Sequence, residues 1–336
     1  MSSHPRRWLA LTAALTAAAT VLVAGCGSSS KNDVNVVGFS ILKGVNAKVI
    51  SDFGKTDAGK GVKFVQSYGA SGDQSRSVLA GLKADVVHFS LEGDITRLVD
   101  AGLVSKDWNT GPTKGIASQS VVVIATRPGN PKKIHSWADL VKPGVKIVTP
   151  DPGSSGSARW NILAAYGSVI ANGGTDAQAQ DYLKKFYANV ATLPKSGRDA
   201  TSTFESGVGD VLISYENEAI TARATGGKLD YFVPDQTLLI QNPAAVTKGA
   251  PKAASDFLAF LEGKEGQLDY AESGFRPLVD VGTFTTQGAN DPSNPFPAPK
   301  TLLTIDKDFG GWSAAATKFF DPKDGIVTKI QAATGS

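Results

Sequence analysis

The stretch Asp151–Trp160, which reads DPGSSGSARW, most constrains how this chain can fold. The β-branched run Lys146–Thr149 precedes it, and apolar residues follow it at helical spacing. The sequence therefore predicts a strand, a tight turn of small residues and the start of a helix. The first amides of such a helix have no intrahelical acceptor, and the positive end of the helix dipole adds to their attraction for anions. The turn is a candidate anion site; a serine N-cap on an ordinary helix is the alternative for this stretch alone.

Length and charge narrow the class of protein. A chain of 336 residues is long for one hydrophobic core, so about two folding units are expected. When Arg6 and Arg7 of the N-terminal leader are left out, the chain has 32 basic and 31 acidic residues. A nearly neutral chain without clustered Lys and Arg does not have the charge pattern of a nucleic-acid-binding protein.

The N-terminus has the pattern of an export signal. Residues 1–25 combine a basic start with the apolar run Trp8–Val23, which is short and too rich in Ala and Thr for a membrane span. The sequence Val-Ala-Gly-Cys ending at Cys26 resembles the bacterial lipobox, which implies lipid on Cys26 and anchoring to the outer face of the cytoplasmic membrane. Residues 26–33 are expected to be a polar tether. Cys26 is the only cysteine, so an intramolecular disulfide is excluded.

From residue 34 onward, strand and helix patterns alternate, which predicts an α/β fold with a mostly parallel sheet. Strands are predicted at 34–40, 62–68, 85–89, 121–127, 146–149, 190–193, 210–215, 238–240 and 244–246. Helices are predicted at 45–53, 95–101, 137–141, 177–187 and 253–270, with 312–320 as the last one. Residues 279–299, rich in Pro, Asn and Gly, are predicted to form a loop.

The order of these segments predicts two lobes. Lobe 1 is expected to contain residues 34–118 and 239–290, and lobe 2 residues 119–238, with residues 291–336 as a C-terminal segment packing on the lobes. Small-residue turns before helices occur at Ser71, at Ser155–Ser157 and at Gly197. In open α/β sheets ligands bind beyond the carboxyl ends of strands, so these turns predict a ligand cleft between the lobes.

Four motifs closely resemble the bacterial sulfate-binding protein family, over about residues 34–330. They are QSYGASG at 66–72, PGV at 143–145 with the stretch 150–160, GVGDVLISYENEA at 207–219, and TID at 304–306 with FGGW at 309–312. The resemblance implies a two-lobed periplasmic-binding-protein-like fold of type II. It also implies a non-enzymatic, monomeric receptor that delivers sulfate or thiosulfate to the permease subunits of an ABC transporter, without cofactor or metal.

The resemblance also implies which residues bind the anion. In this family hydrogen-bond donors alone hold sulfate in the cleft. Carried over by position, the donors are the Ser71 hydroxyl and the amides of Ser155, Gly156, Ser157 and Gly197. Tyr215 takes the place of the family's indole donor, and Ile41 lines up with an aspartate in a first loop that this chain lacks.

Arg159 and Arg198 each follow a proposed anion turn. Both could stabilise the anion-binding turn without contacting the anion themselves. The alternative for each is a surface arginine near a helix start.

Two rival functions stay open. A receptor for molybdate, tungstate or phosphate would use the same turns. Monohydrogen phosphate needs an acceptor for its proton; no matched site position is a carboxylate, but Asp151 and Glu216 adjoin such positions. A serine-dependent enzyme is the rival from another class. Neither Ser71 nor Ser155 lies in a Gly-x-Ser-x-Gly nucleophile motif.

The histidines give no support to a metal enzyme. His88 and His135 show no metal-ligand spacing and are expected to be structural, and the third histidine lies in the leader. A nucleotide-phosphate loop is not indicated either, because no Gly-Lys-Ser/Thr sequence follows the glycines of the turns.

Overall fold

The computed structural model describes residues 33–335. The predicted signal peptide, most of the tether and Cys26 lie outside the described residues. Within 33–335, no helix has both the length and the apolar character needed to cross a membrane.

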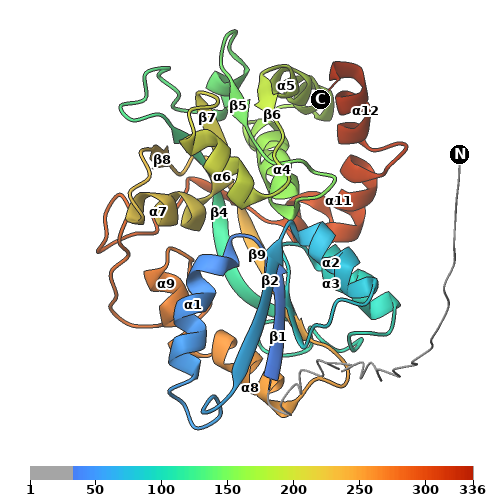
Figure 1. The fold of residues 1–336 in the computed structure, drawn as a ribbon. Coiled ribbons are helices and arrows are strands. Elements are labelled where there is room, and N and C mark those ends of the chain that lie inside the picture. Colours follow the sequence, from blue (N-terminus) through green and yellow to red (C-terminus); the bar gives the residue numbers. More distant parts are fainter. Residues whose placement is uncertain (1–32, 336) are drawn as a thin grey trace, which may run out of the picture. The chain divides into compact units, whose positions relative to one another are not determined.

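The strands form one sheet whose order does not follow the sequence (Figure 1). In spatial order it contains β2 (Lys63–Gly69), β1 (Asp33–Phe39), β3 (Val86–His88), β9 (Gln236–Val246), β4 (Ile116–Thr126), β7 (Val211–Tyr215), β5 (Ile147–Val148) and β6 (Val190–Thr192). β10 (Thr301–Leu303) pairs with β9, and β8 (Asp230–Phe232) pairs with β4. Val and Ile recur in β1, β3 and β7, as expected of buried strands.

The sheet is mixed rather than mostly parallel. Every antiparallel pairing involves β4 or β9, the two eleven-residue strands. The first half of β4 pairs with β9, from Ile116 to Val121, and its second half pairs with β7, from Val122 to Thr126. The last residues of β9 pair with β3. β4 and β9 therefore join the β1–β3 side of the sheet to the β5–β7 side (Figure 1).

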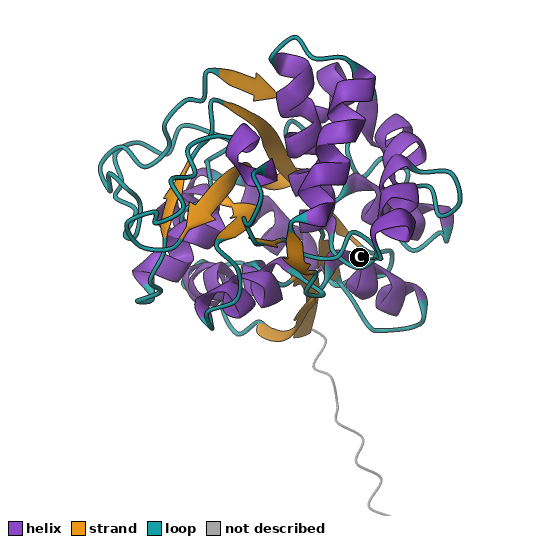
Figure 2. Ribbon diagram, turned by 90° about the horizontal axis from the view of Figure 1, so that it is seen from above, coloured by secondary structure: helices purple, strands orange, loops and turns teal. Residues whose placement is uncertain are grey.

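Helices lie on the outside of the strands (Figure 2). On the β1–β3 side are α1 (Leu42–Phe53), α2 (Ser71–Leu79), α3 (Glu92–Asp100), α8 (Lys252–Glu262) and α9 (Lys264–Glu272). On the β5–β7 side are the 3-10 helix Trp137–Val141, α4 (Gly156–Ala171), α5 (Asp176–Ala188), α6 (Gly197–Glu205) and α7 (Glu216–Ala224). The chain ends with α10 (Ile305–Phe309), α11 (Gly311–Phe320) and α12 (Ile326–Thr334).

Several segments differ from the sequence prediction. β8, β10 and α10 were not predicted, and β4 begins at Ile116 rather than at residue 121. The strands predicted at 238–240 and 244–246 form the single strand β9, because the polar residues between them continue the ladder with β4. The helix predicted at 253–270 is broken at Gly263, whose extended backbone lets α9 turn against α8. A side chain at Gly266 would clash with the Phe260 carbonyl, so glycine permits this close approach. The helix at 312–320 is followed by α12.

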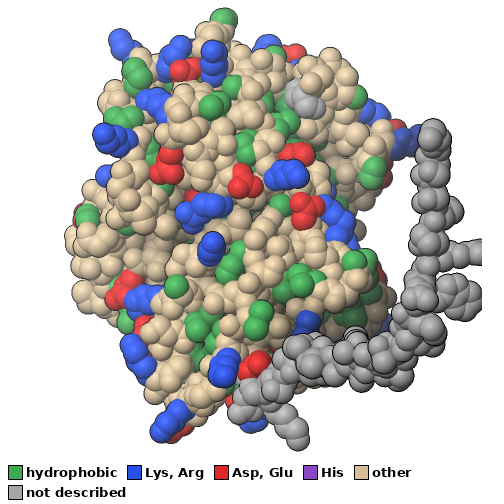
Figure 3. All heavy atoms as spheres, in the orientation of Figure 1, with side chains coloured by type: hydrophobic (Ala, Val, Ile, Leu, Met, Phe, Trp, Pro, Cys, Tyr) green, Lys and Arg blue, Asp and Glu red, His purple; other side chains and the backbone are tan. Residues whose placement is uncertain are grey.

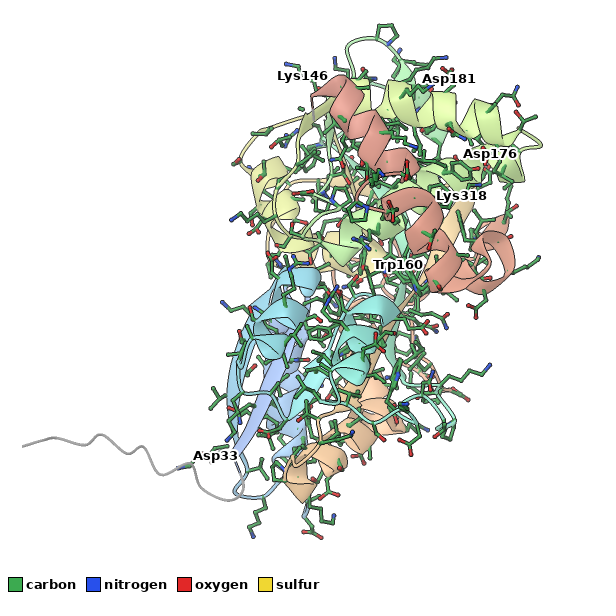
Figure 4. All side chains as sticks on the ribbon, turned by 90° about the vertical axis from the view of Figure 1, so that its right-hand side faces the viewer. Asp33, Lys146, Trp160, Asp176, Asp181 and Lys318 are labelled. Atoms are coloured by element: carbon green, nitrogen blue, oxygen red, sulfur yellow. The ribbon has the colours of Figure 1, made fainter. Side chains whose placement is uncertain are left out.

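The C-terminal segment packs on the β5–β7 side. Lys318 of α11 forms an ion pair with Asp176 of α5 at 2.5 Å. Figure 4 labels both residues, which lie near each other on α11 and α5. The Phe319 ring meets Tyr166 of α4 edge-on, with ring centroids 4.7 Å apart. Burial of this ring holds α11 against α4 more firmly than the exposed ion pair does.

Candidate anion-binding site

The residues predicted to bind an anion lie where strands end and helices begin. Ile41 and Tyr215 occupy the N-cap positions of α1 and α7, and Ser71 and Gly197 are the first residues of α2 and α6. Ser155 caps α4, and Gly156 and Ser157 begin it. Strands β1, β2, β5, β6 and β7 lead into these helices, so their carboxyl ends meet at one place in the sheet.

Close contacts bring these turns together. An added Cβ on Gly197 would lie 3.0 Å from Ile41 Cδ1 and 3.2 Å from Ser157 Oγ. An added Cβ on Gly156 would lie 2.5 Å from Ser90 Oγ, a distance that real side chains do not tolerate. Glycine at position 156 is therefore required for the start of α4 to approach Ser90.

Hydrogen bonds join the turns of the two sides of the sheet. The Gly72 amide donates to the Ser154 carbonyl at 3.1 Å. The Arg198 amide donates to Ser40 Oγ at 3.4 Å. Trp160 Nε1 donates to the Ser90 carbonyl at 2.9 Å, and Figure 4 shows Trp160 at the end of α4 that faces the opposite side. The site is therefore closed over by direct contacts between its two sides.

The amides at the start of α4 and α6 differ in their partners. The Ser155 amide donates to the Asp151 carbonyl at 2.8 Å, so it already has an acceptor in the protein. Within residues 33–335, no acceptor faces the amides of Gly156, Ser157 and Gly197. These three N–H groups at the positive ends of two helices are the donors available to an anion.

The Ser71 hydroxyl has two protein partners. It donates to Asp94 Oδ2 at 2.7 Å and accepts from the Ser90 amide at 2.9 Å. Asp94 is buried and also forms an ion pair with Arg97 at 2.9 Å. To donate to an anion, Ser71 must turn its single proton away from Asp94.

Sequence reasoning did not identify Ser90 and Asp94. Asp94 lies three residues before Arg97, a helical ion-pair spacing that is common on helix surfaces and carries no sign of a binding site. Ser90 stands alone between an apolar strand and α3.

Tyr215 lies at the centre of the site and is fully buried. Its hydroxyl is 2.7 Å from Ser90 Oγ. Burial raises the pKa of Tyr215 above its ordinary value, and the neighbouring side chains of Ser90, Asn242 and Ser157 oppose that rise. The phenol therefore keeps its proton at neutral pH and remains a donor.

Both arginines near the turns are engaged by the protein. Arg159 Nε donates to the Pro152 carbonyl at 3.1 Å, and its guanidinium lies over the Phe320 ring. Arg198 Nε lies 3.1 Å from Glu218 Oε1, and Glu218 is fully buried. Arg198 therefore compensates a buried carboxylate, and Arg159 joins the turn before α4 to α11.

Metal ligands do not gather at this site. Across residues 33–335, no cluster of His, Cys, Asp and Glu is suited to a metal ion. His88 is buried and in contact with Ser118, and His135 is exposed.

Comparisons with known proteins agree on one family. The family model for the bacterial extracellular solute-binding proteins matches residues 34–276. A sulfate-binding protein of Synechococcus elongatus is 39% identical, over 98% of this chain and 97% of the relative. A thiosulfate-binding protein of Pseudomonas aeruginosa is 36% identical, over 80% of this chain and 82% of the relative.

Solved structures show the same architecture. The sulfate-binding protein SubI from Mycobacterium tuberculosis has a TM-score of 0.80 and 42% identity, over 86% of this chain and all of that one. The periplasmic binding protein AfuA from Actinobacillus pleuropneumoniae, with a TM-score of 0.65 and 18% identity, shares the fold alone; the match covers 90% of this chain and 99% of that one. The fold is the two-lobed α/β architecture of periplasmic binding proteins, as predicted. The chain belongs to the bacterial extracellular solute-binding protein family, together with these sulfate- and thiosulfate-binding relatives.

Proposed function

We propose that this protein is the extracytoplasmic receptor of an ABC importer and that it binds sulfate, and also thiosulfate, for delivery to the permease. The proposal rests on the close approach of the first residues of α4 to the first residues of α6. There the amides of Gly156, Ser157 and Gly197 face no protein acceptor within residues 33–335. The names of the relatives, all of them binding proteins, support a receptor rather than an enzyme.

Neutral donors suit a fully deprotonated dianion. Sulfate has four acceptor oxygens and no proton, so N–H and O–H groups alone satisfy it. The dipoles of α4 and α6 and the polarised amides supply the compensating charge without a basic side chain in contact with the anion. Arg159 and Arg198 act from outside through the turns, because their guanidinium groups already contact Pro152, Phe320 and Glu218.

The same donors discriminate against monohydrogen phosphate. That anion carries a proton, and burying the proton without an acceptor costs about 1–3 kcal/mol. Asp94 is the carboxylate that adjoins Ser71, and its two oxygens accept from Ser71 and Arg97. With Asp94 engaged in this way, phosphate is expected to bind less tightly than sulfate.

The lobe boundaries and the anchor are part of the proposal. We take residues 34–118 and 239–290 as lobe 1, residues 119–238 as lobe 2, and residues 291–336 as the segment packed on them. Lipid on Cys26 would hold the monomeric protein at the outer face of the membrane. The face in Figure 3 carries Lys and Arg beside Asp and Glu, which gives no reason to invoke charge-driven attachment instead.

Calorimetric titration of anion-free protein tests the function. Sulfate should bind at one site per chain with a measurable heat, thiosulfate should compete for it, and phosphate should bind much more weakly. Molybdate or phosphate binding more tightly than sulfate would favour a receptor for that anion. A protein that binds none of the four would contradict the proposal.

A further inference from the structure

One buried hydroxyl at the anion site has no partner in the protein. Ser157 is the second residue of α4 and is only 4% exposed, and its Oγ has no hydrogen-bond partner within residues 33–335. Folded proteins pair nearly all of their buried polar groups, because burying such a group without a hydrogen bond is costly. The Ser157 hydroxyl therefore carries a proton that no described residue takes up.

The usual local acceptors do not serve Ser157. A serine in a helix can donate to the carbonyl three or four residues before it. For Ser157 these carbonyls belong to Ser154 and Gly153. They accept instead from the Gly72 amide at 3.1 Å and from Arg76 Nη2 at 3.5 Å. The contacts that join α2 to the turn before α4 thus use the acceptors that would otherwise satisfy the hydroxyl.

The serine hydroxyls of the neighbouring turns differ from that of Ser157, because they have protein partners. They are those of Ser71, which donates to Asp94, of Ser154, which donates to the Lys195 carbonyl, and of Ser196, which donates to Asp199. A hydroxyl without a partner is therefore not a general property of these turns.

The Ser157 side chain lies on the side of α4 that faces the anion site. An added Cβ on Gly197 would lie 3.2 Å from Ser157 Oγ, so this oxygen adjoins the start of α6. Trp160 lies three residues further along, on the same face of α4, and its Nε1 reaches the Ser90 carbonyl on the opposite side of the sheet. The hydroxyl is thus next to the amides of α4 and α6 that face no protein acceptor.

We propose that the Ser157 hydroxyl, in addition to the Ser157 amide, donates a hydrogen bond to the bound anion. The inference rests on the proposed function and adds a side-chain contact to it. The donors at the starts of α4 and α6 then number four, the amides of Gly156, Ser157 and Gly197 and this hydroxyl, and all of them are neutral. The anion supplies the acceptor that the buried hydroxyl lacks in the protein.

Ser157→Ala tests the contact, because it removes the hydroxyl and keeps the amide and the Cβ. Calorimetric titration with sulfate should show an affinity about tenfold to a hundredfold lower, the loss expected for one hydrogen bond to a charged acceptor. Ser157→Gly should lose a similar factor, because the same hydroxyl is missing. A folded Ser157→Ala protein with wild-type sulfate affinity would overturn the proposal. A loss confined to Ser157→Gly would also overturn it, since it would indicate packing of the Cβ.

Ser214→Ala is the matched control. Ser214 is buried, and its Oγ also has no partner within residues 33–335. It precedes Tyr215 on β7, and successive side chains of a strand point to opposite faces, so Ser214 points away from Tyr215 and the anion site. Its replacement should change sulfate affinity by less than about twofold. An equal loss in both variants would show a general effect of removing a buried hydroxyl and would contradict the inference. A wild-type protein that binds no sulfate would instead refute the proposed function.

The Tyr215 hydroxyl is the other group that the Ser157 hydroxyl could serve. Ser157 is among the side chains that oppose the rise in the pKa of Tyr215, although the phenol already has Ser90 Oγ at 2.7 Å as a partner. A double-mutant cycle separates the two roles. In a Tyr215→Phe protein, Ser157→Ala should still lower sulfate affinity at least about fivefold, because the contact with the anion remains. No further loss in the double variant would mean that Ser157 acts only through Tyr215 and would contradict a direct contact.

Discussion

The hydroxyl groups of Ser90 and Tyr215 lie 2.7 Å apart, although 125 residues separate them in the sequence. Ser90 follows β3 and Tyr215 ends β7, so this contact joins the two sides of the sheet at the anion site. Both side chains are buried, and the start of α4 approaches Ser90 so closely that position 156 must be glycine. Changes at Tyr215 and Gly156 therefore test the two contacts that the β5–β7 side of the sheet makes with Ser90.

Tyr215→Phe should weaken sulfate binding. The change removes one hydrogen bond to a charged acceptor and little volume, so the expected loss is about 1.5–3 kcal/mol, or about tenfold to a hundredfold in affinity. Calorimetry measures this loss. Tyr187→Phe is the matched control, because Tyr187 is buried, lies in α5, and its hydroxyl has no hydrogen-bond partner within residues 33–335. Full sulfate affinity in Tyr215→Phe would show that the ring only packs at the end of β7.

Gly156→Ala should impair binding through a steric effect. The new methyl group would meet Ser90 Oγ and Cβ at 2.5 and 2.6 Å, so the start of α4 must move away from Ser90. Sulfate affinity should fall at least about tenfold. Gly93→Ala is the control on α3, where an added Cβ meets nothing within 4 Å and should stabilise the helix by about 0.5–1 kcal/mol. Equal sulfate affinities for the two variants would contradict the close approach described here.

The local parts of this site were predictable from sequence, and the long-range ones were not. The strand, turn and helix start around Gly156 follow from β-branched residues, small residues and helical spacing within fifteen positions. Asp94 and Asn242 were missed because their roles depend on partners 23 and 152 residues away, Ser71 and the Ser90 carbonyl. Nothing in their immediate sequence differs from an ordinary helix or strand position.

The same dependence on partners distant in the sequence explains the errors in the predicted strands and helices. Polar residues around Asn242 interrupt the apolar pattern of β9, so the sequence predicted two strands where one exists. Asn242 itself is buried at the crossing between the two sides of the sheet, where its side chain pairs with Ser118 and with the Ser90 carbonyl rather than with an apolar core. Gly263 did not predict the break between α8 and α9, because a single glycine is tolerated in many helices.

His88 should make the protein less stable in acid. The unfolded chain takes up a proton at histidine near pH 6.5, whereas burial lowers the pKa of His88 in the folded protein to about 3. The neutral His88 therefore contributes fully to the free energy of unfolding above pH 6.5. This contribution is lost as the pH falls toward 3, by at most about 1.4 kcal/mol per pH unit. The free energy of unfolding, measured with urea across this pH range, should change less steeply with pH for His88→Gln than for wild type. The exposed His135→Gln should keep the wild-type slope; if His88→Gln also kept it, His88 would not be the cause.

Cys26→Ala should release the protein from the membrane without weakening sulfate binding. The cysteine belongs to the lipobox-like sequence and lies outside every proposed contact with the anion. Cell fractionation followed by calorimetry of the released protein measures both effects. The length of the mature chain must be checked, since an uncut leader would also hold the variant at the membrane. A correctly processed variant that remains bound would contradict the lipid anchor.

The position of the bound anion tests the central claim most directly. Selenate has the shape and charge of sulfate, and its selenium gives an anomalous signal, so a crystal structure of the selenate complex locates the ligand. We predict one anomalous peak per chain, with selenate oxygens within hydrogen-bond distance of the amides of Gly156, Ser157 and Gly197 and of the Tyr215 hydroxyl. A peak held instead by lysine or arginine side chains away from the starts of α4 and α6 would contradict the account.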